Sequence, residues 1–187
     1  MRRLLVILTA VALLGSCASH MDQEPPHHVS PTTSRADRAH VLEGKQLKHK
    51  PVEPGKLCAS SLGCALVIPV ELTGNELTPP ADPQVLGWWG SKVNAKKGTT
   101  LLIGHTVHTG GGFLNDLDQK ALVGSSVRVS GHVYHVVSNR VISKLKLSQI
   151  APELFSQAGP NKLVVVTCEG YDPATGHYHN NTVVVAK

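Results

Sequence analysis

The sequence predicts an all-β fold, a closed or partly closed β-barrel, in the later part of a 187-residue chain. Six or more short apolar segments, rich in β-branched residues, alternate with turn residues from residue 57 onward. Helical periodicity is scarce in this part, and no internal repeat is visible. All seven aromatic residues (two Trp, three Tyr, two Phe) lie at or beyond Trp88, so the folded core is expected there.

The predicted elements follow one another at short intervals. Segment 65–70 is a β-branched run, and 99–104 is a second. Residues 125–138 alternate on either side of Gly131 and predict a hairpin. Residues 163–167 and 182–186 are continuous apolar strands of the kind buried in a barrel. Two short helices are predicted, at 113–119 and at 147–157, the second with Pro152 at an early position.

The composition excludes several classes of protein. The chain has 18 Lys and Arg against 13 Asp and Glu, a net charge of +5, and its basic residues form no long block interleaved with aromatics. A dedicated nucleic-acid binder is therefore not expected. The cysteines stand at positions 17, 58, 64 and 168, with neither a repeated C-x-x-C pair nor a dense framework. This spacing excludes a structural zinc site and a disulfide-rich scaffold.

Residues 1–16 have the form of a secretory signal peptide. Arg2 and Arg3 precede an apolar run at 4–14, which is too short to span a hydrocarbon core of roughly 30 Å comfortably. The run ends in Leu-Gly-Ser-Cys17, which resembles a lipobox, so Cys17 is expected to carry a lipid anchor. A simply cleaved signal and an uncleaved anchor are the alternatives. All three place the rest of the chain outside the cytoplasmic membrane, and the lipid anchor would hold it on the extracellular face of that membrane.

Residues 17–56 are predicted to form a lipid-anchored disordered tether, and residues 57–187 the β-barrel domain. The tether is rich in Pro, His, Ser, Thr, Lys and Arg, and it has no aromatic residue and no sustained period. Its histidines are interpreted as solvated linker residues rather than metal ligands; they are His27, His28, His40 and His49.

Cys58 and Cys64 bracket a short loop at the start of the domain. In an exported protein a disulfide between them is expected, and it would fasten the domain where the tether ends. A redox role is the alternative, although the spacing differs from that of a C-x-x-C motif.

Two predicted strands lead into residues that can act in catalysis. The strand at 99–104 leads directly into His105, and the strand at 163–167 leads into Cys168. A thiolate nucleophile and an imidazole that returns a proton to a leaving amine would form a catalytic pair. On spacing alone the alternative is that Cys168 is a buried core thiol and His105 a turn residue.

Five motifs occur in an order that resembles the sortase family, specifically the class E and F sortases of actinobacterial type. The histidine precedes the cysteine, unlike the order in papain-like peptidases. The resemblance covers roughly residues 66–186, and its motifs are Val67-Ile68-Pro69, the segment 83–89 (PQVLGWW), Leu102-Ile103-Gly104-His105, the segment 112–117 (GFLNDL), and Val165-Val166-Thr167-Cys168 followed by 171–178 (YDPATGHY).

The resemblance implies an eight-stranded β-barrel and a cysteine transpeptidase. Its substrates would be exported proteins with a C-terminal signal resembling Leu-Pro-x-Thr-Gly, cleaved between Thr and Gly. Cys168 would form a thioester, His105 would act as general acid and base, and Thr167 would help to position the substrate. An amine acceptor, such as a cell-wall precursor or a pilin lysine, would then resolve the thioester.

No cofactor and no metal is expected. His132 and His135 would point to opposite faces of a strand, and His177 and His179 have no evident third ligand.

The sequence departs from the family at one position. Sortases use an Arg near the final strand to stabilise the oxyanion, but no Arg follows Arg140. His179 is the expected substitute, with Asn181 next. A catalytically weak or inactive sortase-fold lipoprotein that binds peptide tails or assists another sortase is therefore the alternative. A metal-binding lipoprotein that uses the His-rich tether is a third hypothesis.

Overall fold

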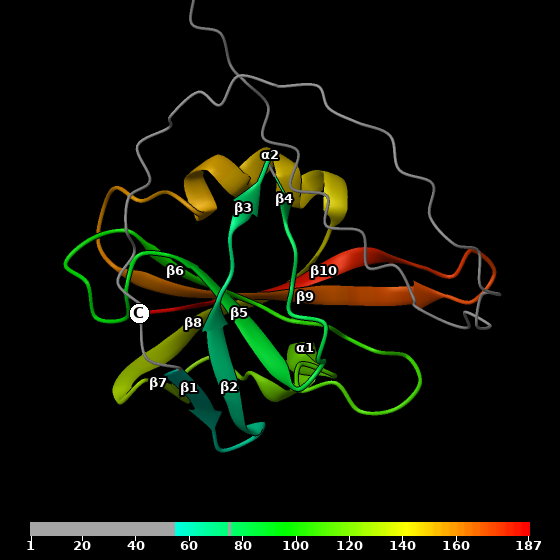
Figure 1. The fold of residues 1–187 in the computed structure, drawn as a ribbon, viewed down its shortest axis with the longest axis horizontal. Helices are drawn as coiled ribbons and strands as arrows, with labels where there is room; N and C mark the ends of the chain where they lie inside the picture. The colour runs from blue at the N-terminus through cyan, green and yellow to red at the C-terminus, as the bar shows by residue number, and fades with distance from the viewer. Residues whose placement is uncertain (1–54, 75) are drawn as a thin grey trace, which may run out of the picture.

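The computed structural model describes residues 55–74 and 76–187 (Figure 1). The predictions for the signal peptide, for lipidation of Cys17 and for the tether up to residue 54 lie outside the described residues. The first strand of the described residues begins at Gly55, two residues before the predicted domain boundary.

Eight strands close into a barrel in the order β1-β2-β5-β6-β9-β10-β8-β7, and a separate β3–β4 hairpin lies beside it. This confirms the predicted all-β barrel with two short helices. The elements are β1 (Gly55–Ala59), β2 (Gly63–Pro69), β3 (Leu72–Thr73), β4 (Glu76–Leu77), β5 (Val85–Gly90), β6 (Thr99–Ile103), α1 (Leu117–Lys120), β7 (Ser126–Val129), β8 (His132–Ser143), α2 (Lys144–Leu154), β9 (Lys162–Asp172) and β10 (His177–Ala186).

One face of each barrel strand points inward and forms the main core. Leu102, Val165 and Val184 alternate with outward residues on β6, β9 and β10, as the two-residue period of a strand requires. Tyr134 is the largest fully buried side chain, and its hydroxyl donates to Asn161 Oδ1 at 2.9 Å. The interior is therefore filled with side chains.

A second core lies on the outer face of β6, β9 and β10. Ile103, Val166 and Val183 point outward and are buried together with Leu147 of α2 and Leu77 of β4. Figure 1 shows α2 and the β3–β4 hairpin on the same side of the barrel. Strands β6 and β9 are consequently apolar on both faces, which explains their continuous runs of hydrophobic residues.

Several elements differ from the predicted ones. The hairpin around Gly131 is confirmed as β7–β8, but helix α2 begins three residues earlier than predicted. Ser143 caps this helix by accepting a hydrogen bond from the Lys146 backbone N–H at 3.1 Å, and Pro152 lies near the end of the helix rather than near its start. The prediction also missed β1 and the β3–β4 hairpin, whose strands are short or largely polar, and β5, whose residues were noted only as a motif.

Cys58 and Cys64 are joined by the predicted disulfide, with an S–S distance of 2.10 Å. They face each other across the antiparallel pair of β1 and β2. Replacing both cysteines with serine is expected to lower the free energy of unfolding by about 2 kcal/mol, because the short ring no longer restricts the unfolded chain. Urea denaturation under non-reducing conditions measures this loss, and an unchanged midpoint would show that strand pairing alone holds β1.

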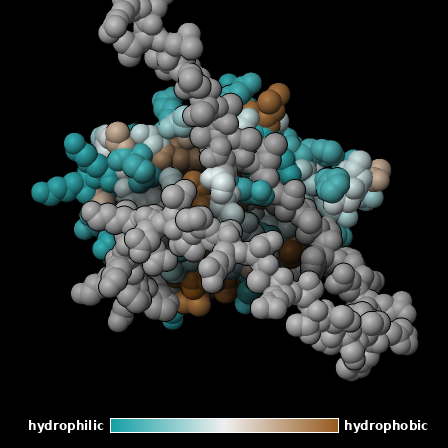
Figure 2. Space-filling model, turned by 45° about the horizontal axis from the view of Figure 1, so that its top comes forward, coloured by the Kyte–Doolittle hydropathy of each residue, from teal (hydrophilic) through white to brown (hydrophobic). Residues whose placement is uncertain are grey.

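The described part of the chain contains no helix that is both long and apolar enough to cross a membrane. On the face shown in Figure 2, hydrophobic residues form small separate groups among hydrophilic ones.

Candidate active site

His105 follows the end of strand β6, and Cys168 lies within the neighbouring strand β9. Strands β6 and β9 are parallel, and their last registered pair is Ile103 and Val166. The Gly104 backbone N–H continues the ladder by donating to the Val166 carbonyl at 3.3 Å. Two residues further along each strand come His105 and Cys168, at the same level. Parallel pairing thus brings together two residues that are far apart in the sequence.

Both side chains point to the outer face of the barrel. A Cβ added at Gly104 would lie 2.6 Å from Leu86 and 2.9 Å from Leu114, so this position faces the inner core. The alternation of side chains then directs His105 outward. Cys168 follows Val164 and Val166 of the outer core at two-residue intervals and is 4% exposed. The Cys168 side chain is thus largely shielded, while His105 is half-buried.

Thr167 fastens the histidine segment to β9 from the inner side. It is 2% exposed, and its hydroxyl donates to the Gly104 carbonyl at 2.9 Å. Its single hydroxyl proton is thereby used, so the Thr106 hydroxyl donates to Thr167 Oγ1 across 2.8 Å. Thr167 and Thr106 bracket His105 on both sides. The predicted contact of the Thr167 hydroxyl with substrate does not fit this geometry, because the hydroxyl is buried on the face opposite Cys168.

Asn181 stands opposite Cys168 on the other neighbouring strand. The two residues are registered partners in the antiparallel pair of β9 and β10, so their side chains share the outer face. Asn181 Nδ2 donates to the Thr167 carbonyl at 3.1 Å, which uses one of its two amide protons. The second proton remains to donate to a group held at Cys168. In this position Asn181 can act as a neutral hydrogen-bond donor.

His179 lies two positions before Asn181 on β10, nearer the tip of the β9–β10 hairpin. Its Nε2 is 3.2 Å from Asp172 Oδ2, and its side chain is 59% exposed. The register therefore places Asn181, rather than His179, at the position facing Cys168. His179 contributes to the hairpin tip, which extends beyond the barrel (Figure 1).

Asp172 organises the hairpin tip. Its carboxylate accepts hydrogen bonds from the Ala174 backbone N–H at 2.9 Å and from the Thr175 hydroxyl at 3.1 Å. These bonds and the His179 ring lower the pKa of Asp172 from 3.8, the Ala174 bond most of all.

The lowered pKa of Asp172 predicts an acid-sensitive hairpin tip. A carboxylate with a depressed pKa in the folded state stabilises that state above pH 3.8, and the contribution is lost as the pH falls through the lowered pKa. Amide hydrogen exchange at residues 172–177 is therefore expected to accelerate in acid. Asp172→Asn should exchange fast already at neutral pH, and an Asp118→Asn control should not. Equal exchange in wild type and Asp172→Asn would exclude this role of the carboxylate.

The loop that follows His105 is held over the inner side of the hairpin by aromatic contacts. The rings of His108 and Tyr171 stack with centroids 3.9 Å apart and planes 4° apart, and Tyr171 contacts Tyr178 at 5.2 Å. Burial raises the pKa of Tyr178, and the charges of Tyr171 and Glu169 add to the effect. Sequence reasoning had missed His108; its spacing of three residues from His105 is the only signal that could have suggested it.

Asn115 closes the same loop. Its amide donates to the Val107 carbonyl at 2.9 Å, and its Oδ1 accepts from the Val107 backbone N–H at 3.0 Å. The backbone after His105 is thus fixed at Thr106, Val107 and His108. The His105 imidazole is therefore carried on an anchored segment.

Within residues 55–74 and 76–187, no group of three or more His, Cys, Asp or Glu residues is arranged to hold a metal ion.

Comparisons with known proteins concern the family and the fold of the chain. The family model described as Sortase domain matches residues 59–187. A search of curated proteins gave no match. The family model matches well over half of the chain, and this match decides the family assignment.

Solved structures with the same fold include sortases of classes C and A. Streptococcus agalactiae sortase C1 in complex with MTSET matches with a TM-score of 0.54 and 16% identity, over 72% of this chain and 68% of that one. Actinomyces oris sortase C-1 matches with 0.54 and 17%, over 71% and 69%. Listeria monocytogenes sortase A matches with 0.52 and 16%, over 71% and 84%. At these identities the likeness shows the fold, and it does not test the expected class E or F subtype.

Proposed function

Because the chain belongs to the sortase family, we propose that it is a cysteine transpeptidase that cleaves an LPxTG-like sorting signal between Thr and Gly. The observation that carries this proposal is the placement of His105 and Cys168 at the same level on the outer face of adjacent strands.

In the proposed first step, the thiolate of reduced Cys168 attacks the carbonyl carbon of the substrate Thr and forms a C–S bond. The protonated imidazole of His105 gives its proton to the Gly nitrogen as the C–N bond breaks. The amine leaves, and the acyl group remains on Cys168 as a thioester. Asn181 donates a hydrogen bond to the developing oxyanion from the facing strand.

In the second step, an amine acceptor attacks the thioester carbonyl. Neutral His105 takes a proton from the attacking nitrogen, the new amide bond forms, and the C–S bond breaks to release the Cys168 thiolate. The enzyme returns to its starting protonation state, so atoms and charge balance over the cycle. The acceptor is proposed to be a cell-wall precursor or a pilin lysine.

The proposed location is the extracellular face of the cytoplasmic membrane. The sequence of residues 1–17 supports it, with a charged n-region, an apolar run and Cys17 at the end of a lipobox-like motif. Assignment to class E or F is proposed on the sequence motifs.

The decisive experiment is to trap the thioester. Wild-type protein in reducing buffer, incubated with a sorting-signal peptide, is expected to gain the mass of the acyl fragment on Cys168, and to form a transfer product when an amine is added. Cys168→Ala should do neither. The double variant Cys58→Ala, Cys64→Ala is the matched control, because it removes two other sulfur atoms and should still form the thioester. If wild type and Cys168→Ala are equally inert on a panel of peptides, the enzyme proposal fails.

Among the described residues no arginine is registered opposite Cys168, and this favours a second candidate, a sortase-fold protein that binds peptide tails with little or no turnover. The arginines of the described residues are Arg128 on β7 and Arg140 on β8, and Arg140 pairs with Val183 rather than with Asn181. Peptide binding that survives Cys168→Ala, with no thioester in the wild type, would favour this function.

A further inference from the structure

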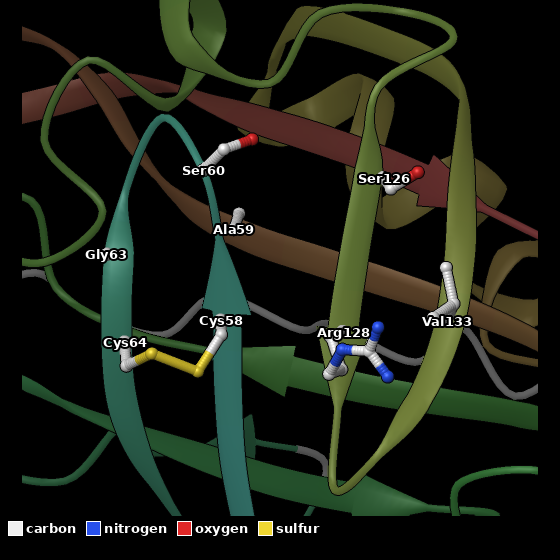
Figure 3. Close-up of a pocket in the computed structure, with 8 residues that line it drawn as sticks. All are labelled: Cys58, Ala59, Ser60, Gly63, Cys64, Ser126, Arg128 and Val133. Atoms are coloured by element: carbon white, nitrogen blue, oxygen red, sulfur yellow. A yellow bond between two sulfur atoms is a disulfide. The ribbon is translucent and has the colours of Figure 1, made fainter.

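A pocket lies on the side of the barrel opposite the candidate active site. Strand β1, which forms part of it, is four places from β9 in either direction around the closed barrel. The pocket has a volume of ≈ 450 Å³, and the Cys58–Cys64 disulfide lies along one side of it. Figure 3 shows the guanidinium of Arg128 over the opposite side, between β7 and Val133 of β8. A ligand bound here would not contact Cys168.

Strand register gathers the polar groups of this pocket on one face. Cys58 pairs with Cys64 on one side and with Arg128 on the other, so these residues form one row across β2, β1 and β7. Ser60 and Ser126 line the adjacent part of the pocket. The pocket therefore presents one guanidinium and two hydroxyls to the same space.

Arg128 is held in place without being neutralised. Its Nη1 donates to the Gly131 carbonyl at 3.1 Å, which fixes the side chain on the β7–β8 turn. The ion pairs found among the described residues are Lys120–Asp116 and His179–Asp172, and neither involves Arg128. A guanidinium carries five N–H donors, so those left over can serve a ligand.

The strands around the pocket carry no acidic residue. The sequences of β1, β2, β7 and β8 contain no Asp or Glu, whereas β1 carries Lys56 and β7 carries Arg128. His135, which pairs with Ser126 across β7 and β8, has its Nδ1 3.2 Å from the Ser126 hydroxyl. An anion entering the pocket therefore meets basic groups and hydroxyls, and no carboxylate on these strands repels it.

We propose that this pocket binds a phosphate group, either of a soluble phosphate ester or of a phospholipid headgroup. A planar carboxylate would be satisfied by the Arg128 fork alone. The donors here instead come from two directions, the guanidinium on one side and the serine hydroxyls on another, and a tetrahedral phosphate has oxygens to accept from both. Arginine is well suited to phosphate recognition because its rigid fork matches the geometry of two phosphate oxygens.

The test uses the full chain and titrates it with glycerol 3-phosphate, with acetate, and with vesicles of phosphatidylglycerol or of phosphatidylcholine. Arg128→Gln is expected to weaken phosphate binding by about tenfold or more, since a hydrogen bond to a charged group is lost. Arg140→Gln is the matched control: it removes the same charge from β8, outside the pocket. Arg128→Lys keeps the charge without the fork and should weaken binding to an intermediate degree, and it decides the question if Arg128→Gln does not fold.

The proposal is supported if glycerol 3-phosphate binds and its affinity falls from wild type through Arg128→Lys to Arg128→Gln, while Arg140→Gln binds like wild type. This result identifies a soluble phosphate ester as the source of the phosphate group. If the protein binds only phosphatidylglycerol vesicles, with the same order of affinities among the variants, the proposal is also supported, and the phosphate group is that of a lipid headgroup. The proposal is overturned if Arg128→Gln and Arg140→Gln weaken binding equally, if acetate binds as tightly as glycerol 3-phosphate, or if neither phosphate probe binds.

Discussion

Replacing Asn181 with alanine is expected to lower kcat for peptide transfer by about 10²-fold, the usual effect of losing one oxyanion donor. Asn181 is the registered partner of Cys168 and shares its outer face, so its second amide proton is available to a group bonded to the sulfur. The loss should fall on kcat more than on KM, because the hydrogen bond strengthens only as charge develops on the oxygen.

Asn180→Ala is the matched control for this prediction. Asn180 is the preceding residue on β10, and its side chain points to the other face, where it lies close to Gly170. Its replacement should leave kcat within about twofold, as expected for a residue that does not touch the reacting atoms. Equal effects of the two substitutions would show that the strand, and not the Asn181 amide, was disturbed.

Asn181→Arg is expected to act in the opposite direction and to raise kcat by about tenfold, since a charged donor binds an oxyanion more strongly than a neutral one. The substitution places a guanidinium on the strand that faces Cys168. If Asn181→Arg is slower than wild type while it still forms the thioester, a charged donor at position 181 cannot replace the neutral Asn181 amide. That result would weaken the proposed role of a simple oxyanion donor.

Thr167→Val is expected to cost both stability and activity. It leaves the Gly104 carbonyl and the Thr106 hydroxyl without their partner in a buried position, at a cost of about 1–3 kcal/mol in the free energy of unfolding. Because these bonds bracket His105, the imidazole should lose its fixed position, and kcat should fall by about tenfold or more. Denaturant unfolding and the transfer assay measure the two effects separately.

Thr167→Ser separates positioning from general stability. Serine keeps the hydroxyl and so should restore kcat, although the lost methyl group still lowers the free energy of unfolding by about 1 kcal/mol. A variant that recovers stability but not activity would contradict the idea that the hydroxyl positions His105. The pH profile of kcat should also change in Thr167→Val and not in Thr167→Ser, because it reports the environment of the imidazole.

The sequence was sufficient to predict the barrel and the two apolar strands that lead to His105 and Cys168, although β9 continues past Cys168 to Asp172. The apolar runs of β6 and β9 are long enough to be recognised, since these strands are buried on both faces by the inner and the outer core. The start of α2 was harder to predict, because a single serine cap decides it. The β3–β4 hairpin has two residues in each strand, too few for any period to be visible.

The finer arrangement of the site depended on register, which the sequence does not display. His179 and Asn181 both lie on β10 and on the same face, and only the pairing of β9 with β10 shows which one is opposite Cys168. The role of Thr167 was equally hidden, because nothing in a Thr-Cys pair indicates whether the hydroxyl points to the substrate side or into the barrel. The His108–Tyr171 stack joins a loop to a distant strand and has no local signal.

The parallel pairing of β6 with β9 also determines when the catalytic pair can form. Gly104 and Thr167, which join the two strand ends, are 63 residues apart in the chain. Strand β9 in turn lies between β6 and β10, and β10 ends at Ala186, one residue before the last. Closing so long a segment is slow compared with forming a hairpin. His105 and Cys168 therefore meet only after the segment between them, which contains α1, β7, β8 and α2, has folded back to bring β9 against β6.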